Sequence, residues 1–423
     1  MAVIYTAKYM LPGNAPLIVG GALLDVDGRI AEVGTLSEVC RGNEQVRVVD
    51  FADTILLPSL VNAHTHLELT DYPRWSAQCG ETAAPSNFVD WILQVIRVKH
   101  TVPHESYLPS IMHGITLSLS AGTGAVGDIL SRFPVRNAYQ ESPLRGMIYL
   151  ESLGQDDDFI RKSLQAVESA LKDKNIGRTQ LGLSPHSPYT ISAEYLKTLY
   201  EKCHDEGLLC ATHVAESADE VEFLRSERGE IGETLYPYVG WQDKLGNPPG
   251  LSPVDYLQRQ GGLSANNLLV HGVQLSEAEI SKVATAGCFL ALCPRSNARL
   301  DVGVAPVRQL LAAGVGLALG TDSLASCDSL SIWDEIAFAR DWFAGQVDAP
   351  SLLQMATAAG AEALGLGAEL GRLQSGYRSS FQVLHPEVLP AEDEVLDFLV
   401  APGRSKEIEQ LYLDGVSVLS GSD

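Results

Sequence analysis

The sequence predicts an α/β fold in which a (β/α)8 barrel is joined to a small β-sandwich domain built from both chain termini. Three observations support this prediction. Strand-like and helix-like segments alternate through the middle of the chain, both ends are rich in short strand-like runs, and histidines or an aspartate stand at the ends of four central runs. In a (β/α)8 barrel the active site forms at the carboxyl ends of the strands.

Eight β-prone runs supply the barrel. They are predicted at 58–66, 115–121, 145–151, 179–186, 208–215, 267–272, 288–293 and 315–321. Helix-like stretches fill the gaps, for example 156–173 and 193–206. The chain has 423 residues, which leaves room for a second domain beside a barrel of roughly 250 residues.

The two flanks of the chain are β-rich, and neither is long enough to bury a core of its own. In the first flank, Asp27 and Gly28 stand between alternating apolar positions, which predicts a hairpin with a tight turn. In the second, strand-like runs cover 381–384 and 411–418. We therefore expect residues 1–57 and 368–423 to form one composite β-sandwich, with the barrel at 58–367.

Ligand-type residues end four of the predicted strands. His64 and His66 close the first strand, His213 the fifth, His271 the sixth and Asp322 the eighth. Residues two apart on a strand point the same way, so His64 and His66 can hold one metal ion, with His213 as third ligand. Asp322 is either a fourth ligand or a hydrogen-bond partner of the water. Imidazoles and a carboxylate without thiolates predict one divalent ion, zinc or else iron, with an open position for catalysis.

Two further residues are candidates for proton transfer. Glu216 follows His213 by three positions, from which its carboxyl group can carry a proton to a substrate nitrogen. The alternative is a solvated glutamate at a helix start. His271 is a candidate to hydrogen-bond the attacking water.

Two insertions interrupt the alternation, at 68–99 and at 236–263. The first contains Trp75 and Trp91, and the second contains Trp241. Long loops on the active-site face often cover the substrate. These rings either give the pocket room beyond the reacting group or attach the loops to the barrel.

The composition excludes several classes of function. Charged residues number 30 Lys and Arg against 53 Asp and Glu, a net charge of −23. So acidic a chain is not expected to bind nucleic acid or an anionic membrane. No signal peptide or membrane-spanning run of about 18 apolar residues is evident. The seven cysteines contain no paired metal motif, which favours reduced thiols and a cytoplasmic location.

Taken together, these segments resemble the amidohydrolase superfamily, and more narrowly its mononuclear, metal-dependent deaminase and triazine hydrolase branch. The resemblance covers almost the whole chain and rests on residues 57–68, 114–128, 184–189, 212–216, 270–272, 293–297 and 320–323. It departs from the family at Ser59, where glycine is usual, and at 379–383 in the small domain.

The resemblance implies roles for individual residues. His64, His66 and His213 match the metal ligands, and Asp322 matches the aspartate that contacts the metal and manages the proton of the attacking water. Glu216 matches the glutamate that protonates the heterocycle. His271 matches the histidine that polarises the hydroxide or the tetrahedral oxygen. His186 stands where the binuclear branch often carries a lysine, which favours a single metal ion and a substrate contact for His186.

Within the branch, the chain is similar to the aminodeoxyfutalosine deaminases of the futalosine route to menaquinone. The implied substrate is a small-molecule adenine nucleoside, 6-aminodeoxyfutalosine, whose 5′ side bears a benzoate and whose 6-amino group is replaced by hydrolysis. The residues expected to contact it are His186, Glu68, Trp91, Arg145 and Arg295, with Arg299 as a further candidate for the benzoate.

Other functions stay open at this stage. Relatives of the same type deaminate methylthioadenosine, S-adenosylhomocysteine or adenosine, and the same metal site suits guanine or cytosine deamination and triazine hydrolysis. A binding barrel without catalysis is the alternative from another class. The chain could also assemble as a homo-oligomer.

Overall fold

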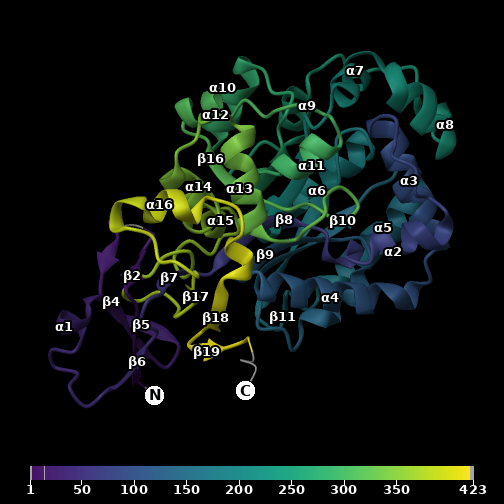
Figure 1. The fold of residues 1–423 in the computed structure, drawn as a ribbon. Helices are drawn as coiled ribbons and strands as arrows, with labels where there is room; N and C mark the ends of the chain where they lie inside the picture. The colour runs from purple at the N-terminus through teal and green to yellow at the C-terminus, as the bar shows by residue number, and fades with distance from the viewer. Residues whose placement is uncertain (1, 14, 420–423) are drawn as a thin grey trace.

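The computed structural model describes residues 2–13 and 15–419. A barrel surrounded by helices lies beside a smaller β domain in which the purple start and yellow end of the chain meet (Figure 1). The predicted fold class, a (β/α)8 barrel with a β-sandwich built from the termini, is confirmed. Among the described residues, no helix combines the length and the apolar character that a membrane span requires.

Eight parallel strands form the barrel, paired in the order β16-β15-β14-β13-β12-β10-β9-β8. They are β8 (Leu60–Thr65), β9 (Thr123–Leu130), β10 (Arg145–Ser152), β12 (Thr179–Pro185), β13 (Cys210–Val214), β14 (Asn267–His271), β15 (Phe289–Leu292) and β16 (Gly316–Leu319). A short strand, β11 (Asn175–Ile176), pairs antiparallel with β12. Most strand residues are buried on both faces, as expected of parallel strands covered by helices.

The second predicted strand, 115–121, is wrong. These residues lie in or directly after helix α4 (Tyr107–Ser120), and the strand is β9, which follows it. The buried positions of α4 are 107, 110, 111, 114, 115 and 118, the three-and-four spacing of a helix. Residues 123–130 are all buried, the pattern of an interior parallel strand. The residues after Gly114 are β-branched or apolar, a composition that a strand and a buried helix share.

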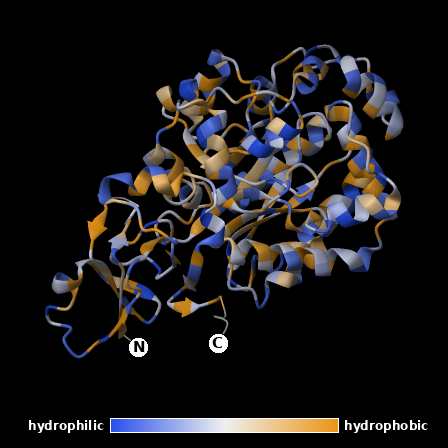
Figure 2. Cartoon of the chain, in the orientation of Figure 1, coloured by the Kyte–Doolittle hydropathy of each residue, from blue (hydrophilic) through white to orange (hydrophobic). Residues whose placement is uncertain are grey.

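Helices cover the barrel and carry both hydrophobic and hydrophilic residues (Figure 2). After β8 come α2 (Tyr72–Cys79), α3 (Phe88–Thr101) and α4, and after β10 and β12 come α5 (Asp157–Ala170) and α6 (Ala193–Glu206). The later ones are α7 (Ala218–Ser226), α8 (Tyr236–Tyr238), α9 (Pro253–Gln260), α10 (Glu277–Ala286), α11 (Pro294–Arg299), α12 (Val307–Ala312), α13 (Ile332–Trp342), α14 (Ala349–Met355), α15 (Ala358–Ala363) and α16 (Val395–Leu399). The two insertions hold α2, α3, α8 and α9 rather than irregular loops.

The small domain contains two sheets. One has the order β5-β4-β1-β6, from β1 (Ala2–Thr6), β4 (Gly21–Val26), β5 (Arg29–Thr35) and β6 (Arg47–Asp50), with the short helix α1 (Leu36–Val39) beside it. The other has the order β19-β18-β17-β7-β2-β3, from β2 (Tyr9–Met10), β3 (Ile18–Val19), β7 (Ile55–Pro58), β17 (Phe381–Leu384), β18 (Ile408–Leu413) and β19 (Val416–Ser417). The second sheet joins both ends of the chain, and the exact domain boundaries stay a prediction.

Local sequence explains the first hairpin and the junction of the two ends. Asp27 and Gly28 both have positive φ between β4 and β5, as a two-residue hairpin turn requires. Strand β17 pairs antiparallel with β7, more than 300 residues earlier in the chain. Leu23, Phe381 and Val383 are fully buried in the core between the sheets.

Candidate metal centre and active site

Histidines from two strands converge at the carboxyl end of the barrel. One ligand atom each from His64, His66 and His213 lies within 4.8 Å of the others. Asp322 follows β16, and its Oδ1 is 3.6 Å from His64 Nε2 and 3.4 Å from His66 Nε2. The strands therefore bring the four predicted metal ligands to one point.

The imidazoles at this point are suited to a divalent metal ion. Both ring nitrogens of His64 are buried and have no hydrogen-bond partner, a costly arrangement unless a ligand pairs with them. His213 Nδ1 lies 2.9 Å from the carbonyl oxygen of His186, to which it donates its hydrogen, and this leaves the lone pair of Nε2 free to bind a metal ion. Burial lowers the pKa of His66 to about 3 and that of His213 well below its usual value, so both rings are neutral and can bind a metal.

Asp322 has a divided environment. Its Oδ2 accepts hydrogen bonds from Ser296 Oγ and Ser326 Oγ, both at 2.7 Å. Its Oδ1 faces the imidazoles of His64 and His66. Two donors on one oxygen fix the carboxylate and leave the other oxygen for a metal ion or a water.

Two residues at this site adopt left-handed backbone conformations. His271 has a φ of 72° and Asp322 a φ of 58°. Such conformations are uncommon for residues other than glycine and often occur at functional sites. Here they turn both side chains at the points where β14 and β16 end.

Glu216 and His271 form a second pair beside the imidazoles. His271 Nε2 is 3.5 Å from Glu216 Oε1, and His271 Nδ1 lies 3.0 Å from Asn297 Oδ1. Because an amide oxygen only accepts, Nδ1 carries the ring hydrogen and Nε2 is an acceptor. Burial raises the pKa of Glu216 well above its usual value, and Asp322 and Glu220 add to the shift. The shift favours the protonated form of the Glu216 carboxyl group.

The turn that presents Glu216 is held by another buried carboxylate. Glu220 accepts hydrogen bonds from the main-chain amides of Ala215 at 3.0 Å and Glu216 at 2.9 Å. Glu216 itself is only 5% exposed. It is therefore not the solvated helix-start glutamate that the sequence left as the alternative.

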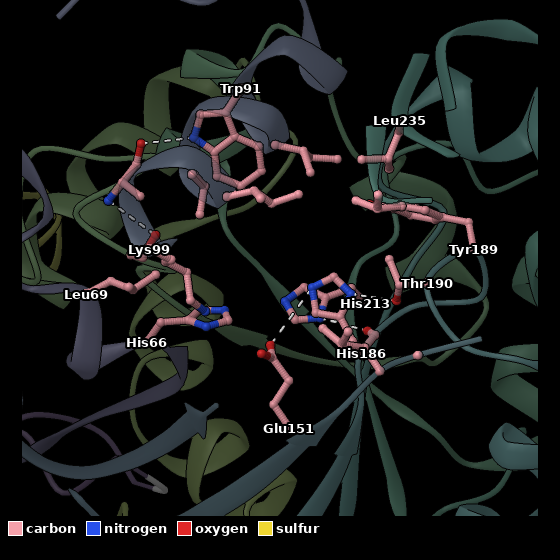
Figure 3. Close-up of a pocket in the computed structure, with 18 of the residues that line it drawn as sticks. His66, Leu69, Trp91, Lys99, Glu151, His186, Tyr189, Thr190, His213 and Leu235 are labelled. Carbon is pink, nitrogen blue, oxygen red and sulfur yellow. Dashed lines mark hydrogen bonds and ion pairs between the residues drawn. The ribbon is translucent and has the colours of Figure 1, made fainter. Parts of the chain in front are cut away.

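These groups open into a pocket of about 600 Å³, a size typical of small-molecule sites. The pocket lies between α3 and the α8 region, with His66 and Lys99 on one side and Tyr189 and Leu235 on the other (Figure 3). Its apolar walls include Leu69, Trp91, Ile92, Val95, Ile96, Phe159, Tyr189, Leu235, Tyr238, Val239 and Trp241. Trp91 Nε1 donates to the carbonyl oxygen of Ala325 at 3.1 Å, which joins the first insertion to the loop after β16.

Two of the predicted substrate contacts line this pocket. His186 lies at the end of β12, with Nδ1 2.9 Å from Thr190 Oγ1 and Nε2 3.9 Å from Glu151 Oε1. Trp91 lies on α3, across the pocket from Leu235 (Figure 3). Of the other tryptophans, Trp241 also lines the pocket, whereas Trp75 is buried against Tyr107 at a ring distance of 5.1 Å.

The other predicted substrate contacts do not line the pocket. Arg145 lies at the amino end of β10, where its guanidinium pairs with Asp414 at 2.6 Å, so that prediction is wrong. The side chain of Arg295 is paired with Asp328 and with Glu335. Arg299 is exposed outside the pocket, and Glu68 is buried behind its wall with 1% exposure.

Four charged pocket residues were missed by the sequence analysis. Lys99 is on α3, Arg132 follows β9, Glu151 is the last but one residue of β10, and Asp156 directly precedes α5. Glu151 stands at a strand end like the ligands and could have been found that way. Arg132 could not have been found that way, because the strand that precedes it, β9, was predicted at 115–121, where the chain forms the end of helix α4.

Comparison with known proteins agrees with this geometry. The amidohydrolase family profile matches residues 55–418. The chain belongs to the amidohydrolase family. This amidohydrolase is 34% identical to the aminodeoxyfutalosine deaminase of Deinococcus radiodurans over 325 residues, 74% of each chain. It is 29% identical to the 5-methylthioadenosine/S-adenosylhomocysteine deaminase of Moorella thermoacetica, over 96% of this chain and 91% of that protein.

Solved structures share the fold of this amidohydrolase along its whole length. Aminofutalosine deaminase of Helicobacter pylori superposes with a TM-score of 0.83 at 24% identity, covering 99% of this chain and 100% of that one. A zinc complex of atrazine chlorohydrolase from Arthrobacter aurescens superposes with a TM-score of 0.81 at 20% identity, over 99% and 95% of the two chains. The predicted family is confirmed, and with it dependence on a metal ion.

Proposed function

We propose that this amidohydrolase is a metal-dependent hydrolytic deaminase that replaces the 6-amino group of an adenine nucleoside with a 5′ substituent, 6-aminodeoxyfutalosine being the preferred substrate. The observation that carries the proposal is the placement of the buried Glu216 carboxyl group, whose pKa is raised, beside three converging imidazoles in the pocket. The relative with 34% identity supports the choice of substrate. A place in the futalosine route to menaquinone is part of this proposal.

In this proposal His64, His66 and His213 hold one zinc ion per chain, with Asp322 as fourth ligand or as partner of the water. When bound, such an ion lowers the pKa of a water and makes it nucleophilic at neutral pH. The remaining chemistry belongs to the protein. Asp322 accepts the proton of the attacking water at Oδ1, the oxygen that its two serine partners leave free.

The other two groups act on the substrate and the water. Glu216 donates its proton to a ring nitrogen next to the reacting carbon, and it has a proton to give because its pKa is raised. His271 accepts a hydrogen bond at Nε2 from the attacking water and so orients it. After addition at the 6-carbon, Asp322 passes the proton it took from the water to the amino group, which leaves as ammonia. Glu216 regains a proton from the added hydroxyl group as the ring carbonyl forms.

The pocket beyond these groups accommodates more than a base. About 600 Å³ lined by Trp91, Tyr238 and Trp241 suits a nucleoside with an aromatic or apolar 5′ tail. A second candidate is deamination of methylthioadenosine or S-adenosylhomocysteine, favoured by relatives that match nearly the whole chain. His186 contacts the sugar in either case.

Release of ammonia by the zinc-loaded protein tests the proposed reaction. The panel contains 6-aminodeoxyfutalosine, methylthioadenosine, S-adenosylhomocysteine, adenosine, guanine, cytosine and atrazine. Ammonia from the modified adenosines supports the proposal. Chloride from atrazine, faster turnover of the free bases, or no reaction with any compound would each contradict it.

Two further expectations belong to the proposal. A cytoplasmic location is supported by the seven cysteines, which are all free thiols. Assembly as a homo-oligomer stays a prediction.

A further inference from the structure

Two cationic side chains stand on the pocket wall, and one of them has no anionic partner. The cationic lining residues are Lys99 and Arg132, and the acidic ones are Glu151, Asp156, Glu216 and Asp322. Among the described residues, no carboxylate lies within ion-pair distance of the Arg132 guanidinium, whereas Arg145 and Arg295 each pair with carboxylates.

The Arg132 side chain is partly buried and incompletely satisfied. Its Nε is buried without a hydrogen-bond partner, and its guanidinium lies over the Tyr107 ring at 5.2 Å from the ring centre. A buried N–H without an acceptor costs stability, and stacking on a ring does not supply one. The guanidinium therefore stands at the pocket wall without a full set of acceptors.

The buried Glu68 holds both cations in place. Its carboxylate accepts hydrogen bonds from Ser131 Oγ and from the main-chain amide of Arg132 at 3.0 Å. Lys99 Nζ donates to Ser131 Oγ at 3.0 Å and is 3.8 Å from Glu68 Oε1. Glu68 thus compensates much of the charge of Lys99. It contacts Arg132 only through the main-chain amide, which leaves the Arg132 guanidinium for a ligand.

We propose that Arg132, supported by Lys99, is an anion subsite that binds a carboxylate at the end of the 5′ substituent. It would make this enzyme selective for adenine nucleosides whose 5′ tail is anionic. A guanidinium fits a carboxylate with two parallel hydrogen bonds. The acidic Glu151 and Asp156 disfavour that carboxylate elsewhere on the pocket wall. This inference rests on the proposed function and deepens it.

Matched substrates test the subsite. The ratio of kcat/KM for 6-aminodeoxyfutalosine to kcat/KM for methylthioadenosine, which lacks a carboxylate, is measured for the wild type and for Arg132→Gln. Truncating one partner of a buried charge pair weakens binding by roughly 10²-fold, so the ratio should fall by about that factor. The ratio of kcat/KM for S-adenosylhomocysteine, which carries a carboxylate, to kcat/KM for methylthioadenosine should fall in the same way.

Two variants serve as comparisons. Arg132→Lys keeps the charge but loses the paired hydrogen bonds, so its ratio should lie between those of the wild type and Arg132→Gln. Arg161→Gln removes an exposed arginine of α5 that pairs with Asp158 outside the pocket, and its ratio should equal that of the wild type. An unchanged ratio in Arg132→Gln would overturn the subsite.

A binding measurement separates failure of the subsite from failure of the proposed function. If no adenine nucleoside is deaminated, the proposed function is wrong, and the subsite is then tested with benzoate alone by calorimetry on the zinc-loaded protein. The wild type should bind benzoate at least ten-fold more tightly than Arg132→Gln. Equal affinities would exclude a carboxylate site at Arg132.

Discussion

The main-chain amide of Asp322 donates a hydrogen bond to the carbonyl oxygen of His64 at 3.1 Å, and this contact closes the barrel at the metal centre. In the opposite direction, the main-chain amide of His66 donates a hydrogen bond to the carbonyl oxygen of Asp322 at 3.3 Å. The first and last strands are thus joined through the residues that would bind the metal. Hydrogen bonds of the Asn62 and Thr65 side chains to Thr321 and Asp322 strengthen the same junction, so barrel closure and ligand geometry are coupled.

Removing a metal ligand should abolish metal binding and activity together. His66→Ala and His213→Ala each take away one neutral imidazole of three, so we expect about one bound ion per wild-type chain and almost none in the variants. Elemental analysis and ammonia release measure both quantities. His204→Ala, at an exposed histidine of α6, is the control. Two ions per wild-type chain, or full activity of the metal-free protein, would contradict the mononuclear site.

Glu216→Gln separates proton transfer from metal binding. The amide has nearly the same shape but cannot donate a carboxyl proton, so turnover should fall by a factor on the order of 10² to 10⁴ while metal content stays constant. Glu222→Gln, at an exposed position of α7, should retain wild-type turnover. Wild-type turnover in Glu216→Gln would mean that another group supplies the proton.

Asp414 should contribute to stability without affecting the chemistry. Its carboxylate pairs with Arg145 at 2.6 Å and Arg178 at 2.9 Å, which links the small domain to the barrel, and Arg378 approaches to 3.4 Å. Asp414→Asn removes the charge that three guanidinium groups share, and we expect unfolding to become easier by roughly 1–3 kcal/mol. The midpoint of thermal unfolding should fall while kcat is unchanged. An unchanged midpoint would show that solvent screens these pairs.

Glu335 should make stability depend on pH. Burial raises the pKa of its carboxyl group to about 8 from a usual value of 4.5, against the lowering effect of Arg295. The folded state therefore holds this proton more tightly than the unfolded state. Its contribution to stability is complete below about pH 4.5 and is lost as the pH rises to about 8.

The variant Glu335→Gln tests this by removing the titrating proton. Over that range the wild type should lose stability relative to the variant, with a slope of up to about 1.4 kcal/mol per pH unit. Urea denaturation of both proteins between pH 5 and 8, with zinc held constant, measures the slope. Parallel curves would show that Glu335 has an ordinary pKa.

The fold and the metal site could be predicted because their signals are local. His64, His66, His213, His271 and Asp322 each end a β-prone run, and the topology of the barrel brings such ends together whatever the details of the helices. The one misplaced strand did not disturb this result, because it carries none of these residues.

The substrate contacts could not be predicted in the same way. Arg145 and Arg132 lie near opposite ends of neighbouring strands, β10 and β9, and nothing in the local sequence separates a guanidinium paired with Asp414 from one that lines a pocket. Glu68 likewise follows the ligand strand directly but points into the protein, toward Ser131. Such assignments depend on contacts between distant segments, which appear only in three dimensions.

The most direct test of the account is the ratio of kcat/KM for 6-aminodeoxyfutalosine to kcat/KM for adenosine, measured by ammonia release with the zinc-loaded enzyme. Burial of an aryl group in the pocket stabilises the bound substrate by roughly 1.5–3 kcal/mol, so we predict a ratio of about 10 to 100 or more. A ratio near one, or guanine or cytosine turned over faster than either nucleoside, would contradict the assignment of a 5′-modified adenine nucleoside.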